Sequence, residues 1–278
     1  MKKELIEERI LKFANWAKSI ASTATDIRLQ LERQVTSSPS EFFYYGLLKR
    51  QSNTLNDINV ILVSSHKDQL GSVFILLRCL LDDFILLNYL DSKNFEEDLL
   101  IHHCASAHEQ NLETIRLSMQ INNKHFNGTN RGMIATADYK VETAKFFTNP
   151  QNEIYFKTKR KNEKERSFKE FPSAKEMINS LSTAEEDNQR SQATANALIR
   201  WKEYSHFVHY SNISNEMENG KMKYFEIIKI QEALSFCYKS VAIISKVFKI
   251  HFNRQHSFKD PDDIIESLME DHYDLKNI

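Results

Sequence analysis

The scarcity of glycine and proline is the feature that most limits what this chain can fold into. Its 278 residues include five glycines and four prolines, whereas these residues make up about 7% and 5% of ordinary globular proteins. Sandwiches, barrels and alternating α/β folds need turn-forming residues about every dozen positions. The sequence therefore predicts an all-α fold of long helices joined by few turns.

The charges of the chain are balanced. There are 37 basic and 38 acidic residues, for a net charge of -1. No whole-molecule field would attract nucleic acid or an anionic membrane, so any such binding has to be local. The N-terminus has no apolar signal core, and charged residues interrupt the most apolar stretch, residues 70–90. We expect a cytoplasmic protein with no membrane contact.

No cofactor is expected from the motifs in the chain. The three cysteines are odd in number and lack Cys-x-x-Cys spacing, which is typical of reduced thiols rather than of zinc or disulfide sites. His102, His103 and His108 lie near Glu109, and Glu203 with His206 forms a single Glu-x-x-His. A di-iron bundle needs two such motifs and two further carboxylates. The five scattered glycines form no phosphate-binding loop.

Apolar residues recur at helical spacing along most of the chain. The spacing predicts helices at about 2–35, 39–65, 68–91, 94–121, 133–147, 174–181, 185–211 and 223–253, with a short C-terminal helix after Asp260 and Pro261. Pro39, Asn94 and Ser173 mark three of the helix starts, as first-turn proline or as caps. Residues 122–132 and 212–221 are predicted to be loops.

We expect a single helical domain over residues 1–278, built as a bundle of long antiparallel helices. The helix at 68–91 is apolar nearly all round, as is typical of a helix that other helices surround. The core would lie within 2–121 and 173–253, with 122–172 as a peripheral insert and 254–278 as a short helix and tail. Within the insert, the segment 157–169 contains seven basic and two acidic residues. This segment is predicted to be either a solvated loop or an exposed helical arm.

Charged residues on the apolar helix at 68–91 form the first candidate site. Arg78 and Asp82 are four residues apart and hence on one face, and Asp83 follows directly. An unpaired buried charge costs several kcal/mol, so Arg78 needs a partner, for which Asp82 is the nearest candidate. The pair is read either as an ion pair that fixes helix register or as part of a functional pocket, and in both readings loss of Asp82 is strongly destabilising.

The second candidate site lies on the helix at 185–211. Helical spacing predicts a core-facing stripe of Leu198, Trp201, Ser205 and Val208 with His209 at its edge, and a solvent side with Lys202, Glu203 and His206. Ser205 and His209 would then need buried partners, which Arg78 and Asp82 can supply. Such hydrogen bonding suits a histidine that acts as a general acid or base, and it equally suits a non-catalytic histidine in the core.

Two sets of residues resemble known helical families. Arg200 followed six positions later by His206 resembles the Arg-x(4 to 6)-His motif of HEPN domains. Many HEPN proteins are dimeric RNA-cleaving toxins or phage-defence effectors. Arg78 and Asp82, together with Tyr204, Ser205 and His209, also resemble an uncharacterised family of bacterial helical proteins with an early Arg-x-x-x-acid helix and a late Tyr-Ser-x-x-x-His helix.

The resemblance implies a HEPN-like effector of a bacterial defence or toxin system. It implies a homodimer that binds or cleaves RNA without metal, as a metal-independent endoribonuclease. Arg200 would contact phosphate, His206 or His209 would transfer the proton, and the basic segments 157–169 and 221–223 would guide the RNA. The substrate-binding residues would be Arg78, Asp82, Tyr204 and Ser205. The alternative is a non-catalytic interaction or small-ligand-binding protein with a buried Arg/Asp/Ser/His network.

Overall fold

The computed structural model describes residues 2–32, 39–64, 70–158, 166–181, 185–209 and 223–248. Within these ranges the regular elements are helices, apart from one antiparallel bridge between Phe156 and Phe168. The α-helices are α1 (Lys2–Glu32), α2 (Pro39–Val63), α3 (Leu70–Ser92), α4 (Glu97–Phe126), α5 (Thr136–Thr148), α6 (Ala174–Asn179), α7 (Glu185–Val208) and α9 (Lys223–Val247), and η1 (Pro150–Tyr155) is a 3-10 helix. The all-α prediction is confirmed. None of the helices described here is long and apolar enough to cross a bilayer.

Some predicted boundaries are confirmed and others are wrong. α2 begins at Pro39, and Ser173 forms a capping box with Glu176 before α6. Asn94 does not cap α4. It adopts a left-handed conformation (φ 51°) in the preceding turn, and Glu96 occupies the cap position. The loop 212–221 and the helix predicted after Pro261 lie outside the described residues.

α4 continues to Phe126, five residues past its predicted end at 121. The reason is Asn122, which was assigned to a loop but is fully buried within the helix. Its amide donates to the carbonyls of Asn130 (3.3 Å) and Ile134 (3.2 Å) and accepts from the Asn130 N–H (3.1 Å). One asparagine side chain thus binds backbone groups of the turn that follows the helix. Because this contact requires Asn122 to lie within α4, the helix continues up to the turn.

The chain divides into two compact units, which we describe separately. The bundle unit comprises residues 1–92 and 177–278, with α1, α2, α3, α7 and α9. The hairpin unit comprises residues 93–176, with α4, α5 and η1. It contains the stretch 122–172 that was expected to be a peripheral insert, and it begins before that stretch, with α4.

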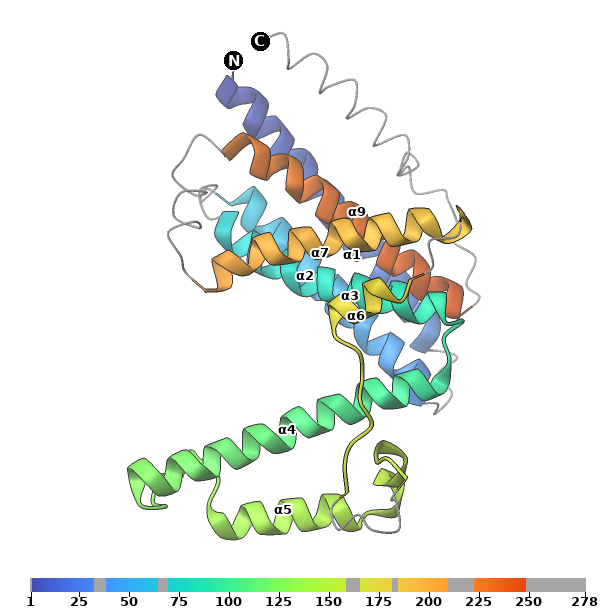
Figure 1. Ribbon diagram of the computed structural model, residues 1–278. Helices are drawn as coiled ribbons and strands as arrows, with labels where there is room; N and C mark the ends of the chain where they lie inside the picture. The colour runs from blue at the N-terminus through green and yellow to red at the C-terminus, as the bar shows by residue number, and fades with distance from the viewer. Residues whose placement is uncertain are drawn as a thin grey trace. The chain divides into compact units, whose positions relative to one another are not determined.

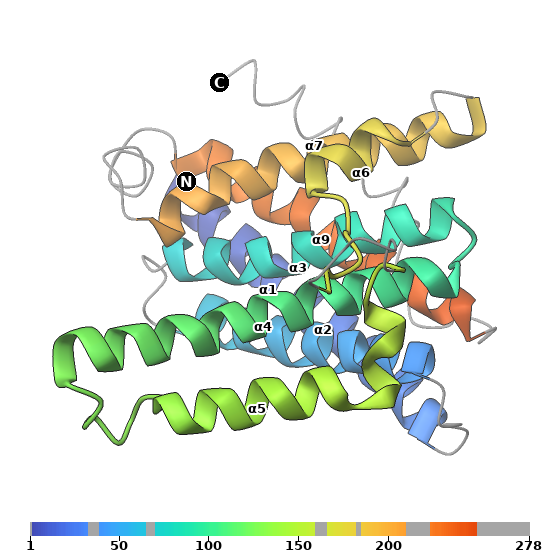
Figure 2. The ribbon, with the colours of Figure 1, turned by 60° about the horizontal axis from the view of Figure 1, so that its bottom comes forward.

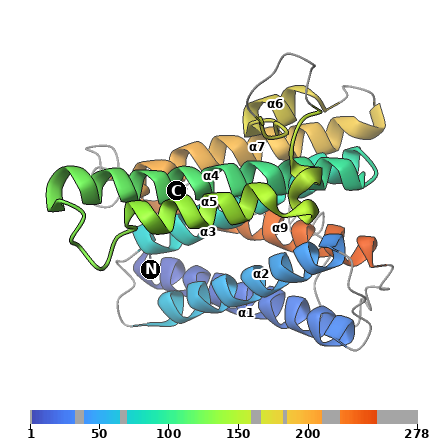
Figure 3. The ribbon, with the colours of Figure 1, turned by 90° about the horizontal axis from the view of Figure 1, so that it is seen from below.

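In the bundle unit, α3 is the central helix, as its composition predicts. It contacts α2, α7 and α9 (Figure 1), and fifteen of its 23 residues are buried. α1 and α2 form an antiparallel pair (Figure 3), which small residues on α1 allow to approach closely. These are Ala14, Ala17, Ala21 and Ala24, all fully buried. The Asn59 side chain on α2 donates to the Ala14 carbonyl at 2.7 Å.

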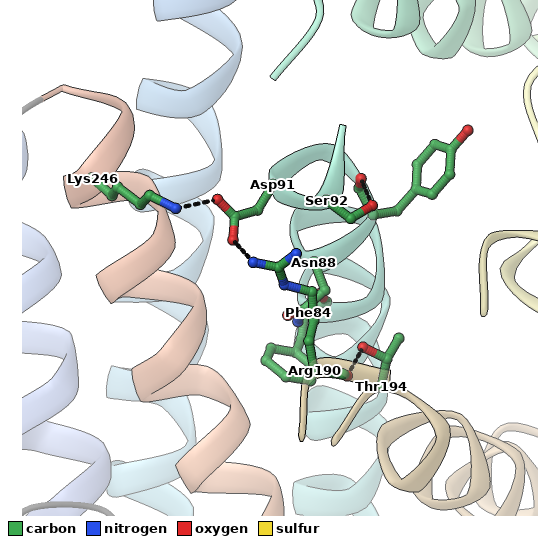
Figure 4. A network of polar contacts seen from close by, with 8 residues as sticks. Phe84, Asn88, Asp91, Ser92, Arg190, Thr194 and Lys246 are labelled. Carbon is green, nitrogen blue, oxygen red and sulfur yellow. Dashed lines mark hydrogen bonds and ion pairs between the residues drawn. The ribbon is translucent and has the colours of Figure 1, made fainter. Parts of the chain in front are cut away.

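Asp91, near the end of α3, ties together three helices of the bundle unit (Figure 4). Its carboxylate accepts from Arg190 on α7 at 2.9 Å and from Lys246 on α9 at 2.7 Å. Burial and the nearby Asp91 raise the pKa of Tyr44 on α2 to about 12. Because both oxygens of Asp91 are bound by cations from neighbouring helices, we assign this network to the packing of the bundle.

In the hairpin unit, α4 and α5 run side by side (Figure 2) over a small core. That core consists of Ala105, Phe156 and Phe168, with four partly buried apolar residues packed against it, and no residue of α5 is buried. The described ends of the basic segment 157–169 belong to this unit and are held by acids. Lys157 pairs with Glu170, Arg166 with Glu153 and Lys169 with Asp98, at 2.5 to 2.9 Å. Residues 159–165 lie outside the described ranges.

Candidate ligand-binding site

A hydrogen bond joins the two motifs that sequence reasoning singled out. Arg78 on α3 donates from Nε to the Ser205 Oγ on α7 at 2.8 Å. The Ser205 hydroxyl in turn donates to the Trp201 carbonyl at 2.7 Å, so its lone pairs are oriented for the arginine. The Arg78 guanidinium also lies over the Trp201 ring, with Cζ 4.6 Å from the centroid. The predicted partnership between Arg78 and Ser205 is therefore confirmed.

The guanidinium of Arg78 keeps part of its hydrogen-bonding capacity open. Only Nε has a hydrogen-bond partner among the described residues. The two Nη nitrogens are not fully buried. Arg78 is half-buried and forms no ion pair within the described part of the chain. Ser205 and Trp201 thus fix the orientation of a cation whose outer nitrogens have no hydrogen-bond partner among the described residues.

Asp82 is exposed and does not form the predicted buried ion pair with Arg78. No oxygen of Asp82 lies within 4.0 Å of an arginine or lysine nitrogen in the described ranges, so the predicted pairing is wrong. Although the residue is exposed, partial shielding of its carboxyl group from water raises the pKa of Asp82, and this outweighs Arg78, the Trp201 indole N–H and Arg50, which each act to lower it. The indole Nε1 is itself buried and forms no hydrogen bond of normal geometry, so it lies near the carboxylate without completing a bond.

The buried acid on α3 is Asp83 instead. Its side chain is 1% exposed and forms an ion pair with Arg50 of α2, whose side chain is 51% exposed. Its Oδ2 accepts from Arg50 Nε at 3.1 Å and from the fully buried Gln51 at 3.0 Å. Burial lowers the pKa of Arg50, and its charge also acts on Asp82. One residue along the helix therefore separates a buried, paired carboxylate from an exposed one.

Arg200 lies on another side of α7 and is held by two carboxylates. Its Nε donates to Glu232 of α9 at 2.5 Å, and its Nη1 donates to Glu203 at 2.7 Å. Burial lowers the pKa of Arg200, but hydrogen bonds to Glu232 and Glu203 outweigh this effect and raise it. Lys229 also pairs with Glu203, at 3.3 Å. This network gives Arg200 a clear structural role between α7 and α9.

The core-facing stripe of α7 differs from the predicted one. Tyr204 is fully buried and stacks on Phe74 at 4.9 Å, whereas Ser205 lies at the edge of the interface. Val208 is 41% exposed, and His209 is exposed beyond the end of the helix. The predicted inward position of His209 is wrong, because a tyrosine buries far more apolar surface than a serine and turns the helix accordingly.

The structure separates the predicted site residues into groups. Arg78 contacts Ser205 and Trp201, Asp82 lies one helical turn from Arg78 on α3, and we call these four residues the Arg78 cluster. Tyr204 packs in the core behind the cluster, Arg200 belongs to the carboxylate network, and His206 is half-buried one turn after Lys202. No group of three or more potential metal ligands occurs in the part of the chain that the structure describes.

Sequence reasoning missed Arg50 and Gln51. Gln51 occupies a core position of α2, between Leu48 and Leu55, which are both fully buried. A glutamine on an otherwise apolar stripe indicates a buried polar partner, and it would have pointed to an acid on a neighbouring helix. Which of the two acids on α3 it meets depends on the rotation of that helix, which the sequence does not state.

Comparison with models of protein families, with curated proteins and with solved structures gave no match.

Proposed function

We propose that the bundle unit binds RNA through phosphate contacts at the Arg78 cluster, as part of a HEPN-like effector of a bacterial defence or toxin system. The observation that carries the proposal is the state of Arg78. Its guanidinium is oriented by Ser205 and Trp201 but is not neutralised by a described carboxylate. Arginine binds phosphate through paired N–H donors of fixed geometry, and fixing the side chain in advance lowers the entropic cost of binding.

The surroundings of Arg78 support a phosphate-bearing ligand. Trp201 provides an aromatic side chain next to the cation. Proteins that bind single-stranded RNA combine such cations with aromatic residues. The chain has no net positive charge, so the contact has to be local, as the cluster is.

Arg200 enters this proposal in a different role from the one that the resemblance implies. A phosphate at Arg200 would have to displace Glu203 and Glu232 or bind beside them, at a cost in like-charge repulsion. We therefore place the first phosphate contact at Arg78. RNA cleavage that involves Arg200 and His206 would follow only after the carboxylates release the arginine.

A second candidate function is the binding of a small polar ligand. The exposed carboxylate of Asp82 beside Arg78 favours it, because the pair offers an acceptor and several donors within one patch. Such a pair suits a ligand that carries both a donor and an acid group. The two candidates share Arg78 and differ in whether a longer chain of nucleotides improves binding.

The test is binding of a short end-labelled single-stranded RNA in EDTA by the full chain. Wild type is compared with Arg78→Gln and with Lys202→Gln, which removes one positive charge from an exposed position of α7. We expect Arg78→Gln to weaken binding about tenfold or more, since a charge-assisted hydrogen bond contributes about 1.5–3 kcal/mol. Lys202→Gln should stay within about twofold of wild type.

Equal affinity of wild type and Arg78→Gln, with both proteins folded by circular dichroism, would contradict the proposal. Competition with a mononucleotide separates the two candidates, because a small-ligand site would be saturated by the mononucleotide at the same concentration as by the RNA. Inspection of the same RNA on a denaturing gel shows whether cleavage accompanies binding.

A further inference from the structure

Asp82 has an environment that the phosphate contact by itself does not explain. It lies one helical turn after Arg78, on the same side of α3, and directly before the sealed Asp83. Arg78, one turn earlier, is oriented by Ser205 and Trp201 of α7, so the carboxylate lies beside a fixed cation. Asp82 nevertheless forms no ion pair in the described ranges, and its side chain is exposed.

A carboxylate in this position selects for a hydrogen-bond donor on the ligand. Ionised Asp accepts hydrogen bonds and donates none, so it repels a second phosphate and attracts a hydroxyl or amine. The donor also has to lie close to the phosphate, since Asp82 and Arg78 are separated by a single turn. In nucleic acids, the group that meets both conditions is the ribose 2′-hydroxyl, which is attached next to the 3′-phosphodiester.

We propose that Asp82 accepts a hydrogen bond from a ribose 2′-hydroxyl while Arg78 binds the adjacent phosphate, so that the cluster distinguishes RNA from DNA. This inference rests on the proposed binding of phosphate at Arg78. The 2′-hydroxyl is the group by which a protein can tell the two nucleic acids apart at a given position. Asp82 is then a specificity-determining residue, and Arg78 provides the affinity that RNA and DNA share.

The balance of charges around Asp82 fits this division of roles. Although the residue is exposed, its neighbours partly shield the carboxyl group from water, and this raises the pKa of Asp82 above its ordinary value of 3.8. A hydroxyl donor compensates for that shielding without adding charge. A ligand with a free ammonium group would also fit the carboxylate, and a competition arm of the experiment tests for it.

The experiment compares three oligonucleotides of one sequence: RNA, DNA, and RNA methylated on every 2′-oxygen, which removes the donor and retains the ribose. Affinities are measured for the full chain as wild type, Asp82→Ala and Asp82→Asn. Asp57→Ala serves as the control, because it removes one negative charge from an exposed position of α2. The readout is the ratio of RNA to DNA affinity, which partial loss of folded protein does not change.

Wild type should prefer RNA to both other ligands by about tenfold, as expected for one hydrogen bond to a charged group. Asp82→Ala should bring the ratio close to one, Asp82→Asn should retain part of it through its amide oxygen, and Asp57→Ala should leave it unchanged. An RNA preference that survives in Asp82→Ala would overturn the assignment.

The failures of the two proposals are distinguishable. Equal binding of RNA and DNA that still depends on Arg78 overturns the role of Asp82 and leaves phosphate binding intact. Absence of Arg78-dependent binding to all three oligonucleotides overturns both. Displacement of the RNA by a free amino acid, at concentrations where a mononucleotide has no effect, assigns Asp82 to an ammonium ligand and also overturns the inference.

Discussion

Asp82 and Asp83 are consecutive residues of the same type, yet they occupy opposite environments. Asp83 is buried, and Arg50 and Gln51 from α2 bind its carboxylate. Asp82 is exposed, and no ion pair within the described residues satisfies it. A rotation of about 100° between neighbouring positions of a helix accounts for the difference, because it takes the side chain from the α2 interface to the surface.

The comparison separates charges that stabilise the fold from charges that are available to a ligand. A buried carboxylate has to be paired, and once paired it has little capacity left for outside partners. Asp91 is likewise paired with cations from two neighbouring helices, and Arg200 is paired with Glu203 on its own helix and with Glu232 on α9. Arg78 and Asp82 differ from these residues because neither forms an ion pair within the described ranges, although Ser205 and Trp201 orient Arg78.

The strongest test of this comparison is Asp83→Ala, which leaves Arg50 and Gln51 without their shared acceptor. We expect a loss of about 3 kcal/mol in the free energy of unfolding. This value is at the lower end for a broken buried pair, because Arg50 can turn its half-exposed side chain to water. Urea denaturation followed by circular dichroism measures it. The double variant Arg50→Met, Asp83→Leu should recover part of the loss, and equal stability of Asp83→Ala and wild type would show that the pair is not buried.

An intermediate effect is expected at Ser205, which orients the open cation. Ser205→Ala removes the acceptor of the Arg78 Nε and should cost about 1 kcal/mol of stability. It should also weaken RNA binding, since Arg78 loses one of the two contacts that hold it. Ser205→Thr retains the hydroxyl and is the matched control. If Ser205→Ala binds RNA as tightly as wild type, the stacking on Trp201 is sufficient to place the guanidinium.

The smallest effect is expected at Asp82 itself. Asp82→Asn should change the free energy of unfolding by about 0.5 kcal/mol, because solvent screens an exposed carboxylate. The folded state raises its pKa above 3.8, so it binds the proton more readily than the unfolded chain does. The resulting stability is complete below pH 3.8 and is lost as the pH rises through the higher folded-state value. Relative to Asp82→Asn, the melting temperature of wild type should therefore fall as the pH rises from below 3.8 to neutral. A difference that does not change with pH would contradict the raised pKa.

The helical architecture could be predicted from the sequence because it depends on local signals. Few glycines and prolines, apolar residues at helical spacing, Pro39 at a first turn and Ser173 with Glu176 at a cap all act within a few residues of one another. Where a helix end depends on a distant contact, the prediction failed. Asn122 reads as a loop residue until its side chain is seen bound to Asn130 and Ile134.

The candidate site was predictable in its residue types and only partly in its contacts. Spacing indicated that Arg78 needs a partner within the bundle, with Asp82 as the nearest candidate, and that Ser205 could be bound by Arg78 or Asp82, of which the contact with Arg78 is observed. It did not indicate that Asp83 rather than Asp82 is the buried acid, or that Tyr204 rather than Ser205 enters the core. Both errors come from a rotation of about one residue, which helical periodicity does not resolve when polar and apolar residues alternate closely.

The sequence by itself determined the helices, the central place of α3 and the need of its charged residues for partners. These follow from composition and from the cost of burying an unpaired charge, both of which are properties of the chain alone. The tertiary structure decided which charges became paired. Arg50, Gln51 and Asp83 meet through the packing of α2 on α3, and Arg78 meets Ser205 through the packing of α7 on α3. Such contacts join residues far apart in the chain, and the rotation that brings them together is set by how large side chains such as Tyr204 and Phe74 fit against each other.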